Sequence, residues 1–203
     1  MHKREFIRLA ARGAAAAAAA GRVSAPAWAA TFLEPAEARR LVLPAAASFE
    51  PAAVALDAAR LARIAELSGT RVPRDFAPRC ERGLTAAGAP CGWAVFDRVV
   101  GKYEAIDYAA GFDAAGAVTG VEILAYRESH GSEIRAASWR RQFVGRRAPA
   151  QMAFEDDIRN VSGATLSCRH VTEGMRRLSA LQSMLPGAQA AATEPSAAVA
   201  AAR

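Results

Sequence analysis

The sequence N-V-S-G-A-T-L-S-C-R-H-V-T, residues 160–172, decides the fold of the C-terminal half of this 203-residue chain. Its small residues predict a turn that runs directly into a helix. The free N–H groups and the dipole of a helix start favour an anion, and small side chains let a ligand approach the backbone. The turn therefore predicts a phosphate site with a hydroxyl beside it, made of Ser162, Gly163, Ala164, Thr165, Leu166 and Ser167.

The spacing of this turn leaves a second interpretation open, a simple helix cap in which Thr165 or Ser167 satisfies the first turn. Serine-protease chemistry fits poorly, because G-x-S-x-G is absent and only His130 and His170 follow the N-terminal segment. A Walker loop is absent as well, and no His/Cys cluster has metal-ligand spacing. We therefore assign no catalytic residue and expect no metal site.

The residues on either side of the turn predict an antiparallel meander followed by a helix. Residues 92–101 and 102–112 show the imperfect alternation of half-buried strands. D-A-A-G at 113–116 is a hairpin turn with Asp first and Gly last, and 117–129 is the answering strand. Apolar residues at helical spacing predict a helix over 167–185. The fold class expected is α+β, a small antiparallel sheet packed with helices.

The stretch S-G-A-T-L-S, opening a helix behind a strand hairpin, resembles the FMN-binding domain family. That family includes the flavin-carrying subunits of the sodium-pumping NADH:quinone oxidoreductase and of the Rnf complex, together with exported flavoproteins. Its S/T-G-A-T threonine is joined to FMN through a phosphoester bond, which a separate magnesium-dependent flavin transferase makes from FAD. The resemblance covers roughly residues 92–185 and implies that Thr165 is the attachment point.

The resemblance also implies flavin contacts in a turn between the last strand and the threonine loop, at Glu128, Ser129, His130 and Gly131. One position departs from the family. The transferase pattern places Asp three residues before the Ser of S-G-A-T, where this chain has Arg159, while Asp156 and Asp157 lie two or three residues further upstream. Either a shifted Asp serves, or recognition tolerates the change, or the flavin is held without a covalent bond.

Residues 30–91 lie outside the resemblance and read as a helical and irregular extension. A short helix is predicted around 36–43. Apolar spacing predicts a longer helix over 50–69, with Pro51 near its start and a glycine at its end. Residues 70–91 read as irregular, with room for one strand.

The cysteines and His170 receive structural interpretations. Cys80 and Cys91 enclose a turn-rich loop that a disulfide could close, and two unpaired thiols are the alternative. Cys168 is expected to be a small buried packing residue, and His170 a structural or surface histidine.

Two further segments complete the pattern. Residues 132–144 predict a helix that ends at a glycine, with Trp139 and Phe143 on one face as core residues. The Ala-rich tail, 186–203, reads as disordered low-complexity sequence.

The first 29 residues read as an export signal. A charged start, a short Ala-rich run and the Ala27-x-Ala29 pattern fit a signal-peptidase site, and the order from Lys3 to Arg8 resembles a twin-arginine signal with lysine for the first arginine. This segment accounts for +4 of the formal charge of +6 and leaves +2. We expect a periplasmic protein with no nucleic-acid partner and no stable membrane span after signal removal.

These patterns and the resemblance together predict an exported FMN-binding electron carrier, or a subunit of a flavin-dependent reductase, more than a stand-alone enzyme. Its expected partners are the flavin transferase and a membrane-bound redox protein. The alternative is a non-enzymatic binding or scaffold domain whose S-G-A-T is only a helix cap.

Overall fold

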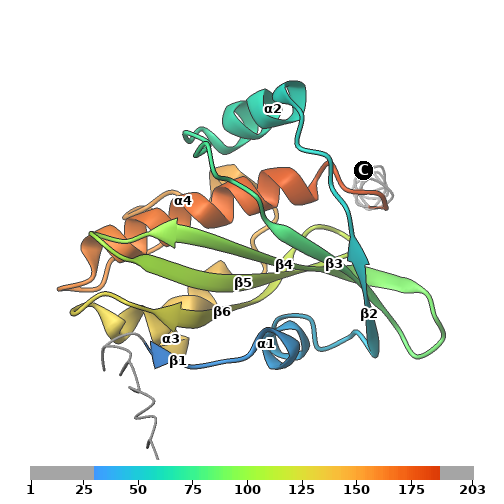
Figure 1. Cartoon of the computed structure of the whole chain (residues 1–203), viewed down its shortest axis with the longest axis horizontal. Helices are drawn as coiled ribbons and strands as arrows, with labels where there is room; N and C mark the ends of the chain where they lie inside the picture. The colour runs from blue at the N-terminus through green and yellow to red at the C-terminus, as the bar shows by residue number, and fades with distance from the viewer. Residues whose placement is uncertain (1–29, 188–203) are drawn as a thin grey trace, which may run out of the picture.

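The computed structural model describes residues 30–187 and consists of one six-stranded antiparallel sheet with helices on both faces (Figure 1). The strand order is β1-β6-β5-β4-β3-β2. The strands are β1 (Ala30–Thr31), β2 (Ser48–Ala52), β3 (Arg79–Leu84), β4 (Pro90–Val100), β5 (Ala105–Asp113) and β6 (Val118–Tyr126). The helices are α1 (Pro35–Val42), α2 (Ala58–Ser68), α3 (Ala137–Arg140) and α4 (Thr165–Gln182), with 3-10 turns η1 (Ser132–Arg135), η2 (Arg141–Phe143) and η3 (Pro149–Gln151). The predicted α+β class is confirmed.

The central meander, β4-β5-β6, forms as the alternation predicts. Its second turn is closed at both ends by Asp113, whose backbone oxygen accepts from the Gly116 N–H at 3.0 Å and whose Oδ1 accepts from the Ala117 N–H at 2.8 Å. Gly116 has φ +80°, a left-handed conformation that glycine adopts without steric cost. The D-A-A-G hairpin prediction is confirmed.

Two helical layers cover the sheet unequally. Figure 1 shows α4 and α2 on one side and α1 on the other. The apolar face of α4, including Val171, Met175 and Leu178, joins the large core with alternate residues of β4 and β5, whereas Phe96 belongs to the smaller cluster under α1. Because α4 packs along the meander through this face, its first turn lies next to one end of the sheet.

The predicted helix over 50–69 begins later than expected. Asp57 is its N-cap and accepts the Arg60 N–H at 2.8 Å, so α2 starts only at Ala58. Residues 48–52 instead form β2 at the edge of the sheet, where a proline such as Pro51 is tolerated. The predicted end is right, because Gly69 forms the C-cap with φ +60°.

The predicted single helix over 132–144 is wrong in detail. The chain forms η1, α3 and η2 in succession, because Ala136 (φ −58°, ψ 129°) interrupts the helical conformation. Trp139 and Phe143 are buried as expected, with edge-to-face rings 5.2 Å apart between centroids. The short helix expected around 36–43 is confirmed as α1.

Residues 30–91 supply strands β1, β2 and β3 of the same sheet as well as helices α1 and α2. The disulfide between Cys80 and Cys91 does not form, and both are free thiols. Cys80 lies opposite Val95, four residues along β4 from Cys91. That offset is about 13 Å at about 3.3 Å per residue, beyond the reach of a disulfide.

Two predicted segments, the export signal at 1–29 and the Ala-rich tail from 188 onward, lie outside the described residues. Across residues 30–187, no helix has both the length and the apolar character needed to cross a bilayer.

Candidate functional site

A pocket of about 350 Å³ lies at the end of the sheet where α4 begins, where β6 ends and where β4 turns into β5. This volume lies at the lower end of the range of small-molecule sites, about 300–1,000 Å³. Its lining comprises Lys102, Tyr103, Glu128, Ser129, His130, Gly163, Ala164, Thr165, Leu166 and Ser167. The fold thus brings together the two segments that the sequence predicted as one site. Lys102 and Tyr103 were not predicted.

The first turn of α4 offers backbone donors and has no side-chain cap. Ala164 is the N-cap, Thr165 is the first helical residue, and no side chain accepts a capping hydrogen bond there. Within residues 30–187, the N–H groups of Thr165, Leu166 and Ser167 have no hydrogen-bond acceptor. Such groups and the helix dipole attract an anion. The structure therefore lacks the side-chain cap, from Thr165 or Ser167, that the simple-cap interpretation predicts.

The hydroxyl of Thr165 is exposed and oriented. Its Oγ1 accepts a hydrogen bond from Asn160 Nδ2 at 2.9 Å. The turn before it places Gly163 at φ +84°, and a Cβ there would meet nothing within 4 Å, so glycine is needed for the backbone conformation. Ser162 precedes it as an exposed residue of the same turn and does not line the pocket.

Ser167, unlike the exposed Thr165, is a buried structural residue. Its Oγ forms a 3.0 Å hydrogen bond with the hydroxyl of Tyr126 at the end of β6. Tyr126 in turn donates to the backbone oxygen of His130. Burial raises the pKa of Tyr126, which keeps the hydroxyl protonated as a donor. Tyr126 thus joins the threonine loop to the turn after β6, a link that sequence spacing did not reveal.

The turn after β6 packs directly on the threonine loop. Gly131 has φ +87°, and a Cβ added there would lie 2.7 Å from the Tyr126 hydroxyl and 3.0 Å from Ala164 Cα. Only glycine allows so close an approach. Ser129 and His130 are exposed on the pocket side, with Ser129 Oγ 2.8 Å from His130 Nδ1.

The carboxylate of Glu128 accepts hydrogen bonds from the backbone of the β4–β5 turn. Its Oε1 accepts the N–H groups of Tyr103 at 2.6 Å and Glu104 at 2.9 Å. His170 touches the same β4–β5 turn from α4, as a structural histidine.

Cys168 is fully buried next to the site, and burial raises the pKa of its thiol to about 11. A thiol held protonated in this way is a weak nucleophile. The expected packing role is confirmed. Trp139 and Phe143 do not line the pocket.

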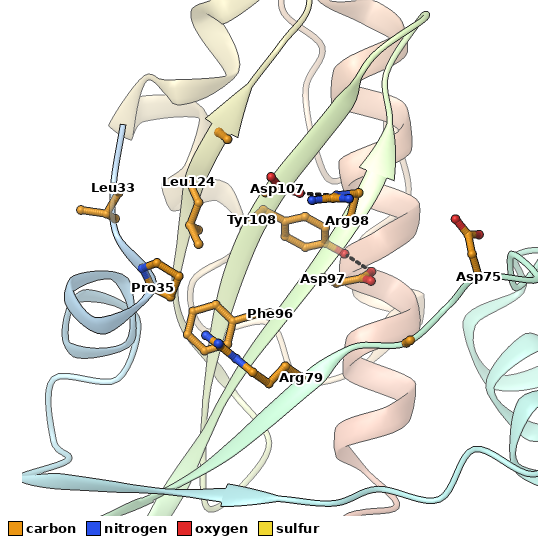
Figure 2. Close-up of a pocket in the computed structure, with 12 residues that line it drawn as sticks. Leu33, Pro35, Asp75, Arg79, Phe96, Asp97, Arg98, Asp107, Tyr108 and Leu124 are labelled. Carbon is orange, nitrogen blue, oxygen red and sulfur yellow. Dashed lines mark hydrogen bonds and ion pairs between the residues drawn. The ribbon is translucent and has the colours of Figure 1, made fainter. Parts of the chain in front are cut away.

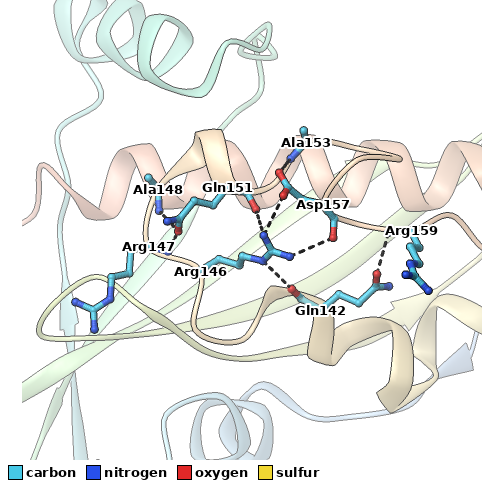
Figure 3. Close-up of polar contacts among 8 residues, drawn as sticks. All are labelled: Gln142, Arg146, Arg147, Ala148, Gln151, Ala153, Asp157 and Arg159. Atoms are coloured by element: carbon cyan, nitrogen blue, oxygen red, sulfur yellow. Dashed lines mark hydrogen bonds and ion pairs between the residues drawn. The ribbon is translucent and has the colours of Figure 1, made fainter.

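The loop that leads into the threonine turn is braced by Arg146 (Figure 3). Arg146 donates to the backbone oxygens of Gln142 and Gln151 and contacts Asp157 Oδ1 at 3.1 Å. Asp157 Oδ2 also accepts the Ala153 N–H at 2.9 Å, and this bond together with Arg146 lowers the pKa of Asp157. The carboxylate of Asp157 is therefore committed to the loop.

Asp156 and Arg159, the two other residues at or near the position where the family pattern has Asp, are exposed. The Arg159 backbone is fixed, because its N–H donates to Gln142 Oε1 at 2.8 Å and its oxygen accepts from Trp139 Nε1 at 2.9 Å. The side chains at 156 and 159 are thus presented at the surface by a rigid backbone.

A larger cavity of about 590 Å³ lies on the opposite, α1 face (Figure 2). It contains none of the predicted site residues. Its Arg98 forms an ion pair with Asp107, and Arg79 stacks on the Phe96 ring at 4.2 Å. We therefore place the functional site in the smaller pocket, where free backbone donors and an oriented hydroxyl converge. Within residues 30–187, no group of three or more His, Cys, Asp or Glu residues is arranged to hold a metal ion.

Residues 101–180 match the FMN-binding domain family. The match includes all ten predicted site residues, together with Lys102 and Tyr103. No curated protein matches the chain.

The residues of the pocket fit FMN on structural grounds. Three unbonded N–H groups at a helix start suit its phosphate, and an exposed threonine hydroxyl lies on the same turn. The remaining lining, from the β4–β5 turn and the turn after β6, leaves room for a ring system. Residues 101–180, the segment that builds the pocket, are similar to the FMN-binding domain family, and this similarity supports flavin binding.

Proposed function

We propose that the protein is an exported electron carrier that holds FMN covalently through a phosphoester bond to Thr165. It passes electrons between a membrane-bound redox partner and an acceptor outside the cytoplasm. The observation that carries the proposal is the exposed Thr165 hydroxyl, which lies on an uncapped helix start inside the pocket.

The attachment step is a phosphoryl-type transfer that needs no base from this chain. The Thr165 oxygen forms a bond to the FMN phosphorus of FAD, the bond from that phosphorus to the bridging oxygen breaks, and AMP leaves. The threonine proton passes to a group of the flavin transferase. The exposure of Thr165 supports this division of labour, since the other enzyme must reach the hydroxyl.

Bound FMN would accept and release one or two electrons, while the protein supplies its placement and surroundings. A covalent bond suits a compartment without free flavin, because a dissociated cofactor is lost by dilution. The chain has no dinucleotide-binding fingerprint, which supports a carrier or reductase subunit that receives electrons from another protein.

The test is coexpression of the full chain with a flavin transferase, followed by a denaturing gel. We expect a band with flavin fluorescence and a peptide containing Thr165 whose mass has grown by one FMN less one water. A colourless protein of unmodified mass, folded alike with and without flavin, would leave the scaffold alternative in place.

Asn160→Ala is expected to slow covalent loading without abolishing it. Its amide orients the Thr165 hydroxyl through one exposed hydrogen bond. Loss of one such contact, at about 0.5–1.5 kcal/mol, corresponds to a roughly 2- to 10-fold lower rate. The rate is measured as in-gel fluorescence against time with purified transferase and FAD. Asn160→Asp, which cannot donate when ionised, should behave like Asn160→Ala, and equal rates for all three chains would remove Asn160 from the site.

Arg159→Asp is expected to raise the rate of loading. It restores the carboxylate at the position where the family pattern has Asp, on a backbone already fixed by Gln142 and Trp139. Arg159→Ala removes the positive charge without adding a carboxylate, so it separates the two effects of Arg159→Asp. Asp156→Asn tests whether the transferase recognises the exposed upstream carboxylate in the parent chain. If Arg159→Asp loads no faster than Arg159→Ala, recognition does not depend on an acid at this position.

A further inference from the structure

The turn between β4 and β5, residues 101–104, is a tight hairpin next to the proposed flavin pocket. The Gly101 N–H donates to the Glu104 oxygen at 2.8 Å and closes it. Its two central residues, Lys102 and Tyr103, both line the pocket. The Lys102 ammonium lies 4.9 Å from the centre of the Tyr103 ring.

Glu128 holds this hairpin from the end of β6. One carboxylate oxygen accepts two successive N–H groups, those of Tyr103 and Glu104. Gly101 makes room for the carboxylate, since an added Cβ would lie 2.7 Å from Glu128 Oε1. Bonds from backbone N–H to a charged acceptor are stronger than neutral ones.

His170 holds the hairpin from the other side. Its Nδ1 lies 2.7 Å from the Val100 oxygen and 2.9 Å from the Gly101 oxygen. It is five residues after Thr165 on α4. The hairpin is therefore tied both to the turn after β6 and to the helix that bears the attachment threonine.

Two large apolar side chains that line the pocket are exposed to solvent. Tyr103 is 75% exposed, and Leu166, on the first turn of α4, is 41% exposed. Both line the pocket, and they come from different elements. A planar apolar ring bound in the pocket would cover surface on both.

We propose that Tyr103 is the residue that packs on the flavin ring, and that Glu128 and His170 are positioning residues that hold Tyr103 there. The inference rests on the proposed function, because a phosphate fixed at Thr165 leaves the ring to occupy the part of the pocket next to the hairpin. Glu128 then acts through two backbone bonds and not by direct chemistry on the flavin.

Packing against a phenol quenches flavin fluorescence, so the contact can be read without any redox partner. The full chain, loaded by coexpression with the transferase, is compared native and denatured at equal flavin content. For Tyr103→Leu we expect native fluorescence to rise several-fold, because leucine cannot donate an electron to the excited flavin as a phenol in contact with the ring does. Covalent loading is measured on the denaturing gel, so that fluorescence is compared per bound flavin. Tyr103→Trp, which restores a quenching ring, stays as dim as the parent chain.

Glu128 has a matched pair of variants. Glu128→Gln keeps an oxygen that can accept both N–H groups, so its fluorescence stays close to that of the parent chain, whereas Glu128→Ala releases the hairpin and brightens the flavin. If Tyr103→Leu is as dim as the parent at equal loading, or if Glu128→Gln is as bright as Glu128→Ala, the inference is overturned. A chain that takes up no covalent flavin refutes the attachment instead. Titration of free FMN into the parent and Tyr103→Leu chains then tests Tyr103 by the same quenching.

Discussion

Thr165→Ala is expected to remove covalent flavin completely while the protein stays folded. On the threonine turn itself, no other hydroxyl can replace it. Ser167 is buried and bonded to Tyr126, and Ser162 lies outside the pocket lining. After coexpression with a flavin transferase, the variant should show no fluorescent band on a denaturing gel.

The fold tolerates this change because Thr165 supports little structure. Its hydroxyl accepts one exposed hydrogen bond, from Asn160, and does not cap α4. The expected loss of unfolding free energy is about 1 kcal/mol or less. Thr165→Ser is the positive control for loading, and Ser162→Ala is the neighbouring control that should load normally. A fluorescent band that persists in Thr165→Ala places the bond on another residue.

Sequence patterns predict the elements of this fold best where local chemistry decides. The meander and its turn follow from alternation and from an Asp that bonds its own turn. Helix α4 follows from apolar spacing. Strand β2 was missed because Val54 and Leu56 extend the apolar spacing of α2 backward, whereas Asp57 caps the helix after them. Only pairing with β3 makes residues 48–52 a strand.

The candidate site likewise has parts that the sequence predicts and contacts that only the folded chain shows. The small residues of the threonine turn predict that turn from the sequence alone, whereas the turn after β6 was predicted only from the resemblance to the family. The contacts that assemble them join distant residues, Tyr126 with Ser167 and Glu128 with the backbone of Tyr103. No spacing rule connects such pairs, so only the folded chain reveals the hairpin as part of the pocket.

A second large effect is expected at a polar cluster between the sheet and α4. Tyr108, fully buried on β5, donates to Asp97 Oδ2 at 2.9 Å (Figure 2). Burial raises the pKa of Asp97, and this hydrogen bond and the charge of Arg177 act in the opposite direction. Gly174 lets α4 approach, since a Cβ there would lie 2.3 Å from the Tyr108 hydroxyl. Within the core, the Tyr108 phenol is therefore the side-chain donor that satisfies the Asp97 carboxylate, beside the backbone N–H of Arg98.

Tyr108→Phe should destabilise the fold by about 1–3 kcal/mol near neutral pH, because Asp97 loses its side-chain donor. Without that donor the pKa of Asp97 rises further above its ordinary 3.8. A raised folded-state pKa means that the stability contribution of Asp97 is present at low pH and lost as pH rises through the folded value. The penalty of the mutation is thus smaller in acid, where Asp97 is protonated in both chains.

Urea unfolding at about pH 3, below the ordinary pKa of an aspartate, and at about pH 7 measures this difference, with Asp97→Asn as the background control. In that background position 97 does not titrate, so Tyr108→Phe should cost the same free energy of unfolding at both pH values. Gly174→Ala, which displaces the hydroxyl without deleting it, should reproduce the pH dependence. A penalty for Tyr108→Phe that is equal at both pH values in the parent chain would mean that the phenol fills space and does not support the charge, because lost packing alone has no reason to follow the protonation of Asp97.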